Sequence, residues 1–324
     1  MRLREEGYPV MSLCAVLELP RSTYYHQPAK RDDQALRAAI EELAGRFPTY
    51  GSRRIRAQLR RPPYRMDVSR KQVQRLMGEL GLKRSPKRRK PRTTESDHPH
   101  PRYPNLVKGM EVTYPDQVWV SDITYIRLGK EFVYLAVLMD VFTRSIRGWN
   151  LSRSLDGQLT LVALRRALAL HVPTIHHSDQ GVQYAAEDYI ALLEGHDILI
   201  SMAGQGNPQE NGYAERLIRT IKEEEVELCE YEDFADALEG IGHFIEEVYQ
   251  RKRIHSALGY LTPEEFEARW WEGRARAEVA TLLNSAEKVS NFMGPLQSPP
   301  HHSIQDHRQQ PLYTIFGPTP RSGP

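Results

Sequence analysis

Three acidic residues in the second half of the chain have the side-chain chemistry of a metal-dependent phosphoryl-transfer site. Asp122 lies near the centre of VWVSDITYI (118–126), and Asp179 ends the strand-like segment TIHHSD. Glu215 lies in a helical pattern after a Gly-Asn-Pro turn, and thirty-five residues separate it from Asp179. Mg²⁺ binds carboxylate oxygens and keeps open positions for phosphate and water. The chain has 42 acidic residues, so the neighbouring residues carry more weight than the spacing.

Strand and helix patterns from Asp116 onward should position these acids. In chain order we expect three strands, a helix, a strand, a helix, a strand and two helices, at 117–126, 131–144, 145–152, 155–171, 174–179, 186–197, 198–202, 211–226 and 233–252. The near-continuous apolar segment 131–144 should be central in the sheet. This order is that of an α/β, ribonuclease-H-like fold with a mixed five-stranded sheet and flanking helices.

Four further residues near the acids have candidate roles, and three of them have more than one. We expect Asp140 to order the turn after its strand or to pair with Arg144, with metal binding as the weaker alternative. Glu210 lies at the start of a helix, where its negative charge interacts favourably with the helix dipole. His177 is a candidate for contact with DNA or with the acids from behind. Tyr184 could stack on a base or pack under the site.

The helix that carries Glu215 also presents two basic residues on one face. Arg219 and Lys222 follow Glu215 at i+4 and i+7. A separation of seven residues spans about 10 Å, so Lys222 could touch DNA one or two nucleotides from the metals. A surface ion pair between Glu215 and Arg219 is the structural alternative.

Charge is distributed unevenly along the chain. Residues 1–110 hold 25 Lys and Arg against 11 Asp and Glu (+14), and the remainder holds 19 against 31 (−12), which together give the net +2. This asymmetry indicates a nucleic-acid-binding arm on a catalytic body, because ordinary solvated faces mix both signs.

Three amphipathic helices are predicted within 31–82, and the third is the most informative. Ser69 can cap it, with Gln72 completing a capping box. Its apolar stripe consists of Val73, Leu76, Met77 and Leu80. The side chains directed elsewhere, where a DNA groove would lie, are Arg70, Lys71, Gln74 and Arg75. This pattern predicts a small all-α helix-turn-helix domain, and a helical bundle with a basic surface is the alternative.

The remaining segments connect or flank these two domains. We divide the chain into an N-terminal helical segment, the helix-turn-helix-like domain, a basic Pro-rich linker, the catalytic core and a largely disordered tail, at 1–30, 31–82, 83–112, 113–272 and 273–324. Residues 270–289 could extend the core's last helix into that tail. In the linker, KRSPKRRKPR should lie along DNA phosphates, through residues that include Lys87, Arg88, Arg89 and Lys90.

Composition restricts the cellular setting. The two cysteines, Cys14 and Cys229, have no metal-ligand spacing and favour a reducing cytoplasm. No apolar run reaches the length of a membrane span, and the first residues lack the pattern of a secretory signal.

The residues around the three acids resemble one family. VSDITYI, HSDQGVQY, GNPQENGYAER and RIHSALGYLTPEEF are similar to segments of the OrfB-type transposases of the insertion sequence 3 family, from about Glu41 to Trp270. These are DDE transposases with a retroviral-integrase-like catalytic core. Glu210 departs from the commoner Asp of the family pattern.

This resemblance implies a specific chemistry. Asp122, Asp179 and Glu215 would be the catalytic metal ligands, with Mn²⁺ as a substitute for Mg²⁺. As a hypothesis, Asp122 and Asp179 share one ion, and Asp122 and Glu215 hold the other. Water would free a 3′-hydroxyl at each transposon end, and that hydroxyl would attack target DNA. We therefore expect a bacterial, nucleoid-associated protein that binds transposon ends and target DNA, forms a homo-multimer and has an OrfA-type partner.

Two other classes of function remain as alternatives. A metal nuclease of the same fold would cut without strand transfer, but it would not need the basic three-helix arm or RIHSALGYLTPEEF. A DNA-binding regulator or inactive remnant would bind without cutting, although the intact acids disfavour it. Loss of cleavage with retained binding in Asp179→Asn would separate binding from catalysis.

Overall fold

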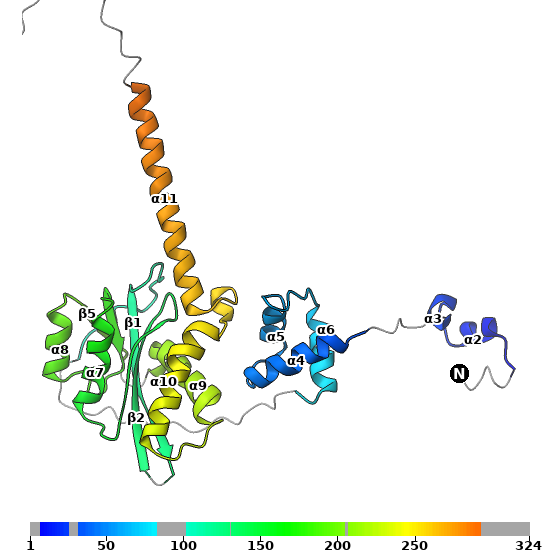
Figure 1. Cartoon of the computed structure of the whole chain (residues 1–324), viewed down its shortest axis with the longest axis horizontal. Coiled ribbons are helices and arrows are strands. Elements are labelled where there is room, and N and C mark those ends of the chain that lie inside the picture. Colours follow the sequence, from blue (N-terminus) through cyan, green and yellow to red (C-terminus); the bar gives the residue numbers. More distant parts are fainter. Residues whose placement is uncertain (1–6, 26–31, 83–101, 130, 205–206, 293–324) are drawn as a thin grey trace, which may run out of the picture. The chain divides into compact units, whose positions relative to one another are not determined.

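The computed structural model describes residues 7–25, 32–82, 102–129, 131–204 and 207–292 (Figure 1). The predicted DNA contacts in the linker and the tail from residue 293 onward lie outside these residues. The chain divides into two compact units, Met1–Trp270 and Trp271–Pro324, and the packing between elements described below lies within the first. None of the helices in these described ranges is both long and apolar enough to cross a membrane.

A mixed five-stranded sheet forms the core. Its strands are β1 (Val118–Leu128), β2 (Glu131–Asp140), β3 (Ile146–Ser152), β4 (Ile175–Ser178) and β5 (Leu199–Met202). Their order is β3-β2-β1-β4-β5. The pairs β1–β2 and β2–β3 are antiparallel, whereas β1–β4 and β4–β5 are parallel. The predicted mixed sheet is therefore confirmed.

The position and length of the most apolar strand differ from the prediction. β2 lies between β3 and β1, and β1 occupies the centre because it pairs with both β2 and β4. β2 also ends at Asp140 instead of residue 144. There the Arg144 N–H donates to the Asp140 carbonyl at 2.9 Å, which closes a turn.

Helices cover both faces of the sheet, as Figure 1 shows. They are α7 (Gly157–Leu168), α8 (Glu187–Glu194), α9 (Gly212–Ile221) and α10 (Phe234–His243). On one face, Val118, Val120 and Ile126 of β1 pack with α9 and α10. On the other, Trp119 and Ala136 pack with α7 and α8. Full burial of each large apolar side chain contributes about 1.5–3 kcal/mol, so both layers hold the sheet in place.

The helices predicted at 211–226 and 233–252 are present, but the second part of each is π-helical. π-helical turns continue α9 and α10 directly, and two short 3-10 turns flank them. These segments are η1 (Pro208–Asn211), η2 (Lys222–Val226), η3 (Phe244–Lys252) and η4 (Ser256–Leu258), where η2 and η3 are the π-helical ones. The final helix, α11 (Pro263–Phe292), continues through 270–289 as predicted, so the described part of the predicted tail is helical.

The described residues before the sheet form the helices α2 (Val10–Val16), α3 (Arg21–Tyr25), α4 (Gln34–Arg46), α5 (Ser52–Leu59) and α6 (Arg70–Glu79). The last three share a hydrophobic cluster that includes Ile40, Ile55 and Leu76. The predicted cap of α6 is present, because Ser69 Oγ accepts from the Gln72 N–H at 3.2 Å. The reciprocal half of a capping box is replaced, since the Gln72 side chain donates to Asp33.

Candidate active site

Strand β1 places Asp122 on the sheet face covered by α9. Side chains alternate along a strand, so Asp122 shares its face with Val120 and Ile126, which pack against that helix. Its carboxylate is half-buried, and Oδ1 accepts the Ile123 N–H at 2.8 Å. A carboxylate at the edge of an apolar layer is costly unless it is paired or ligated.

The register between β1 and β4 relates the position of Asp179 to that of Asp122. Val118, Trp119 and Val120 pair with Ile175, His176 and His177 in parallel. Continued by two residues, this register would set Asp122 beside Asp179, the first residue after β4. Neighbouring strands are about 4.8 Å apart. This register therefore favours a position of Asp179 near Asp122, just beyond the end of β4.

The backbone after β4 orients the Asp179 carboxylate. The Gly181 N–H donates to Asp179 Oδ1 at 3.0 Å. A Cβ on Gly181 would lie 3.0 Å from that same oxygen, so a larger residue would push the carboxylate away. Glycine is required here for close approach.

Glu215 lies on α9, which Asn211 attaches to β1. Asn211 is 3% exposed, and its Nδ2 donates to the carbonyl of Ser121, next to Asp122, at 3.0 Å. Glu215 follows Asn211 by four residues, about one helical turn, and is half-buried. Asn211 had no assigned role in the sequence interpretation, since its function depends on a contact between distant segments.

A layer of buried polar side chains lies beneath the acids. His176 Nε2 is 3.1 Å from Ser121 Oγ and 2.9 Å from the Tyr189 hydroxyl. Burial lowers the pKa of His176 to about 3, so its ring is neutral. Burial raises the pKa of Tyr184 well above its usual range, with Tyr189 and then the negative charges of Asp122 and Asp179 adding to the effect. The two acids therefore impose a negative potential on their surroundings.

His177 and Tyr184, which were candidates for DNA contact, are both interior. His177 is fully buried with Nδ1 2.9 Å from Ser201 Oγ, and Tyr184 is 2% exposed. Neither ring presents a surface to DNA in this structure. Tyr184 packs under the acids, which is the second of the two interpretations offered for it.

The remaining candidate DNA contacts differ in their surroundings. Arg70, Lys71 and Gln74 are exposed on α6, away from its buried stripe. Arg75 is also exposed, but it forms ion pairs with Asp33 and Glu79. An anion would have to compete with these carboxylates for Arg75.

The two basic residues that follow Glu215 are both accessible. Arg219 is exposed, whereas Lys222 is half-buried with Nζ 4.7 Å from the centre of the Tyr125 ring. Lys222 begins the π-helical segment η2.

Asp140 and Glu210 have structural partners. Asp140 is fully buried and accepts from the Thr143 N–H and hydroxyl at 2.8 and 2.6 Å, so it orders its turn as expected. Its cationic neighbour is Arg147, at 4.0 Å, instead of Arg144. Glu210 accepts from the Gly204 N–H and from Asn105, each at 2.8 Å, and these bonds lower its pKa.

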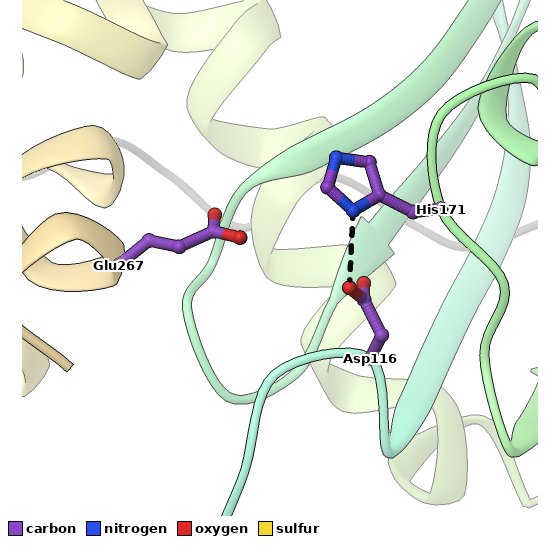
Figure 2. Close-up of side chains that lie close together, drawn as sticks. All are labelled: Asp116, His171 and Glu267. Atoms are coloured by element: carbon purple, nitrogen blue, oxygen red, sulfur yellow. Dashed lines mark ion pairs between the residues drawn. The ribbon is translucent and has the colours of Figure 1, made fainter. Parts of the chain in front are cut away.

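One group of potential metal ligands lies elsewhere (Figure 2). Among the described residues, only Asp116, His171 and Glu267 have ligand atoms all within 4.8 Å of one another, so the predicted triad is more open. The buried Arg147 takes the central place: its Nε is 2.8 Å from Asp116, and its terminal nitrogens are 3.0 and 2.8 Å from Glu267. A guanidinium already supplies the positive charge, so we interpret this group as an ion-pair network.

Comparison with known proteins defines the class. Family models described as "Integrase core domain" match residues 112–208 and 196–263, and one described as "HTH-like domain" matches residues 30–91. The chain therefore combines an integrase-type polynucleotidyl-transferase core with a helix-turn-helix-like domain. A solved HTLV-2 integrase catalytic core domain in complex with magnesium is similar at a TM-score of 0.38 and 16% identity, over 47% of this chain and 97% of that chain.

Full-length relatives define the family. The "Insertion element IS600 uncharacterized 31 kDa protein" of Shigella sonnei is 35% identical over 80% of this chain and 98% of that protein. The "Transposase for insertion sequence element IS629" of Shigella sonnei is 31% identical over 86% and 98%. "Transposase InsF for insertion sequence IS3A" of Escherichia coli (strain K12) is 30% identical over 80% and 94%. The chain belongs to the insertion sequence 3 family of transposases.

Proposed function

We propose that this transposase catalyses metal-dependent 3′-end cleavage and strand transfer of an insertion sequence, with Asp122, Asp179 and Glu215 as its catalytic acids. The observation that supports the proposal is the register of β1 and β4, which, continued past the end of β4, would bring Asp179 beside Asp122 on the face covered by the Glu215 helix. The rival acids Asp140 and Glu210 are engaged in structural hydrogen bonds.

The chemistry of the three side chains fits divalent metal ions. All three are half-buried carboxylates, the ligand type that Mg²⁺ and Mn²⁺ prefer. The negative charges of Asp122 and Asp179 also contribute to the raised pKa of Tyr184. An open triad suits two ions, because different ligand pairs can serve each. When bound, Mg²⁺ activates a water or 3′-hydroxyl and neutralises charge on the leaving oxygen.

The chain's own residues hold this site in shape. The Ile123 and Gly181 N–H groups orient the carboxylates of Asp122 and Asp179, and Asn211 fixes α9 against β1. Fixed ligands reduce the reorganisation needed at the transition state. Arg219 and Lys222, one and two turns beyond Glu215, would contact the DNA backbone, and their accessibility supports this role.

Binding partners follow from the two domains. The exposed basic side chains of α6 are suited to transposon-end DNA, and the core would act on those ends and on target DNA. Joining two ends requires two sites, so we propose a homo-multimer. We also propose an OrfA-type partner, on the basis of the family.

A strand-transfer assay with labelled transposon-end DNA and Mg²⁺ tests the proposal. We expect Asp122→Asn, Asp179→Asn and Glu215→Gln each to lower joining on the order of 10³-fold, since each removes a ligand charge while keeping side-chain shape. The matched control is Asp188→Asn, an exposed acid on α8, which should act like wild type. Equal activity in the three variants would show that the wrong acids are named.

Two other outcomes identify the alternatives. Cleavage without joining, with and without an OrfA-type partner, would indicate a metal nuclease. DNA binding without cleavage under both conditions would indicate a regulator or an inactive remnant.

A further inference from the structure

A basic cavity lies apart from the three catalytic acids. Its volume is about 470 Å³, and none of the acids lines it. Six arginines contribute to its wall: Arg53, Arg56, Arg60, Arg61, Arg70 and Arg269. The first five come from α5, the residues after it and the start of α6, and Arg269 comes from α11. Among the described residues, Glu265 is the only acid in the wall, so this part of the lining carries a large positive excess.

Four of these six arginines form no ion pair within the described residues, and three of the four are exposed. Within the described part of the chain, no ion pair is found for Arg53, Arg70 or Arg269, and all three side chains are exposed. Arg60 pairs with Asp67, and Arg61 pairs with Glu265. Each guanidinium has five N–H donors, so even the paired arginines keep donors for another acceptor.

Direct contacts between the two domains hold the wall together. Arg61 donates to the Tyr260 carbonyl at 3.1 Å as well as to Glu265. The Ile254 N–H donates to the Tyr50 hydroxyl at 2.9 Å, and Ile254 is buried in the hydrophobic cluster of α4–α6. The cavity is thus formed jointly by the helix-turn-helix-like domain and the segment RIHSALGYLTPEEF with the helix that follows it.

We propose that this cavity binds a backbone phosphate of DNA, so that both domains hold one strand. Clustered guanidiniums repel one another, and an anion in the cavity would relieve this repulsion. Their N–H pairs match phosphate oxygens bidentately. The choice of DNA over a free phosphate rests on the proposed function, because a transposase must hold DNA on both domains.

Equilibrium binding of labelled duplex DNA tests the proposal in EDTA, so that no catalysis is required. We expect Arg53→Gln and Arg269→Gln each to weaken binding about tenfold at low salt, equally for transposon-end and unrelated duplexes. The slope of log K against log salt should become less steep by about one. Because both arginines would hold one phosphate, the double variant should lose less than the product of the single losses.

Two matched controls lie outside the cavity. Arg65→Gln in the helix-turn-helix-like domain and Arg165→Gln on α7 change exposed arginines, and each should stay within about twofold of wild type. Urea unfolding of every variant checks that the fold is intact.

Three results would overturn the proposal. The first is wild-type-like binding and salt slope in the Arg53 and Arg269 variants, and the second is equal losses in the controls. The third is calorimetric binding of inorganic phosphate that depends on Arg53 and Arg269 while DNA binding does not, which would assign the cavity to a free anion. None of these results depends on strand transfer, so the catalytic proposal would stand or fall separately.

Discussion

Asn211 links the two elements that carry Asp122 and Glu215. Its side-chain N–H donates to the Ser121 carbonyl beside Asp122, and Glu215 follows one turn later on the same helical segment. A single buried hydrogen bond therefore sets how far apart two of the proposed ligands lie. Small displacements of catalytic groups are costly, with about 10²-fold in rate for 1 Å.

Substitution of Asn211 should affect activity more than stability. We expect Asn211→Ala to lower strand transfer on the order of 10²-fold and the free energy of unfolding by about 1–3 kcal/mol, because the Ser121 carbonyl loses its donor. The matched control is Asn150→Ala, which removes a similar bond to the Leu159 carbonyl on the opposite side of the sheet. Equal losses of activity per folded molecule in the two variants would contradict a positioning role for Asn211.

Single-residue predictions from sequence succeeded where local chemistry decides the outcome. Ser69 caps its helix and Asp140 orders its turn, because both act on backbone a few residues away. The environments of His177 and Tyr184 could not be predicted in this way. A histidine or a tyrosine suits a DNA surface and a packed interior equally, and only the layering of α8 on the sheet decides between them.

The start of α11 is fastened to the sheet by one buried arginine. Arg147 of β3 is 5% exposed and donates to both oxygens of Glu267, while Asp116, just before β1, accepts from its Nε. Phe142 also makes a tilted ring contact with Phe266 and a T-shaped one with Trp270 of the same helix. The arginine and the aromatic contacts together hold the first part of α11, up to Trp270, on the core.

Removal of the Glu267 charge should destabilise the protein measurably. We expect Glu267→Gln to lower the free energy of unfolding by about 1–3 kcal/mol, less than for an isolated buried pair because Asp116 and Asp140 still neutralise Arg147. The control on the same helix is Glu272→Gln, an exposed i,i+4 partner of Arg276, with an expected change below about 0.5 kcal/mol. Urea unfolding measures both, and similar values for the two would contradict the role of Arg147 as a clamp.

At the scale of elements, hydrophobic periodicity predicted every strand of the sheet and its covering helices. It could not predict that β1, instead of the more apolar β2, would be central, since strand order depends on the crossover that brings β4 beside β1. It also missed the π-helical turns after α9 and α10, because one extra residue per turn barely changes the apolar pattern.

The whole molecule carries buried neutral histidines in two separate places. Burial lowers the pKa of His176 to about 3 beneath the acids. Burial and the neighbouring Arg253 lower the pKa of His255 to about 2, where the helix-turn-helix-like domain meets the core. Both histidines bind a proton below about pH 6.5 in the unfolded chain but not in the folded one. The contribution of these two histidines to the free energy of unfolding is therefore fully present above about pH 6.5. It decreases as the pH falls from there toward the pKa values of the folded protein.

Acidification should accordingly destabilise the protein well before its carboxylates titrate. Between pH 7.5 and 5.5 we expect the two histidines to lower the free energy of unfolding by about 2–3 kcal/mol. In His255→Gln this pH-dependent loss should shrink by about 1.4 kcal/mol, whereas exposed His196→Gln should keep it in full. Urea unfolding at pH 7.5 and 5.5 measures this loss for each variant. An unchanged pH dependence in His255→Gln would contradict the interpretation of His255 as a buried neutral histidine.

The parallel register of β1 and β4 has a genetic consequence. Side chains alternate with a period of two, so a one-codon deletion within 118–121 that shifts the strand would turn the residue-122 carboxylate to the opposite face of the sheet. The three acids would still be present in the translated sequence, and the reading frame would stay open. Copies of such an insertion sequence could thus lose transposase activity through an in-frame deletion. A search for the three acidic residues alone would not detect this change.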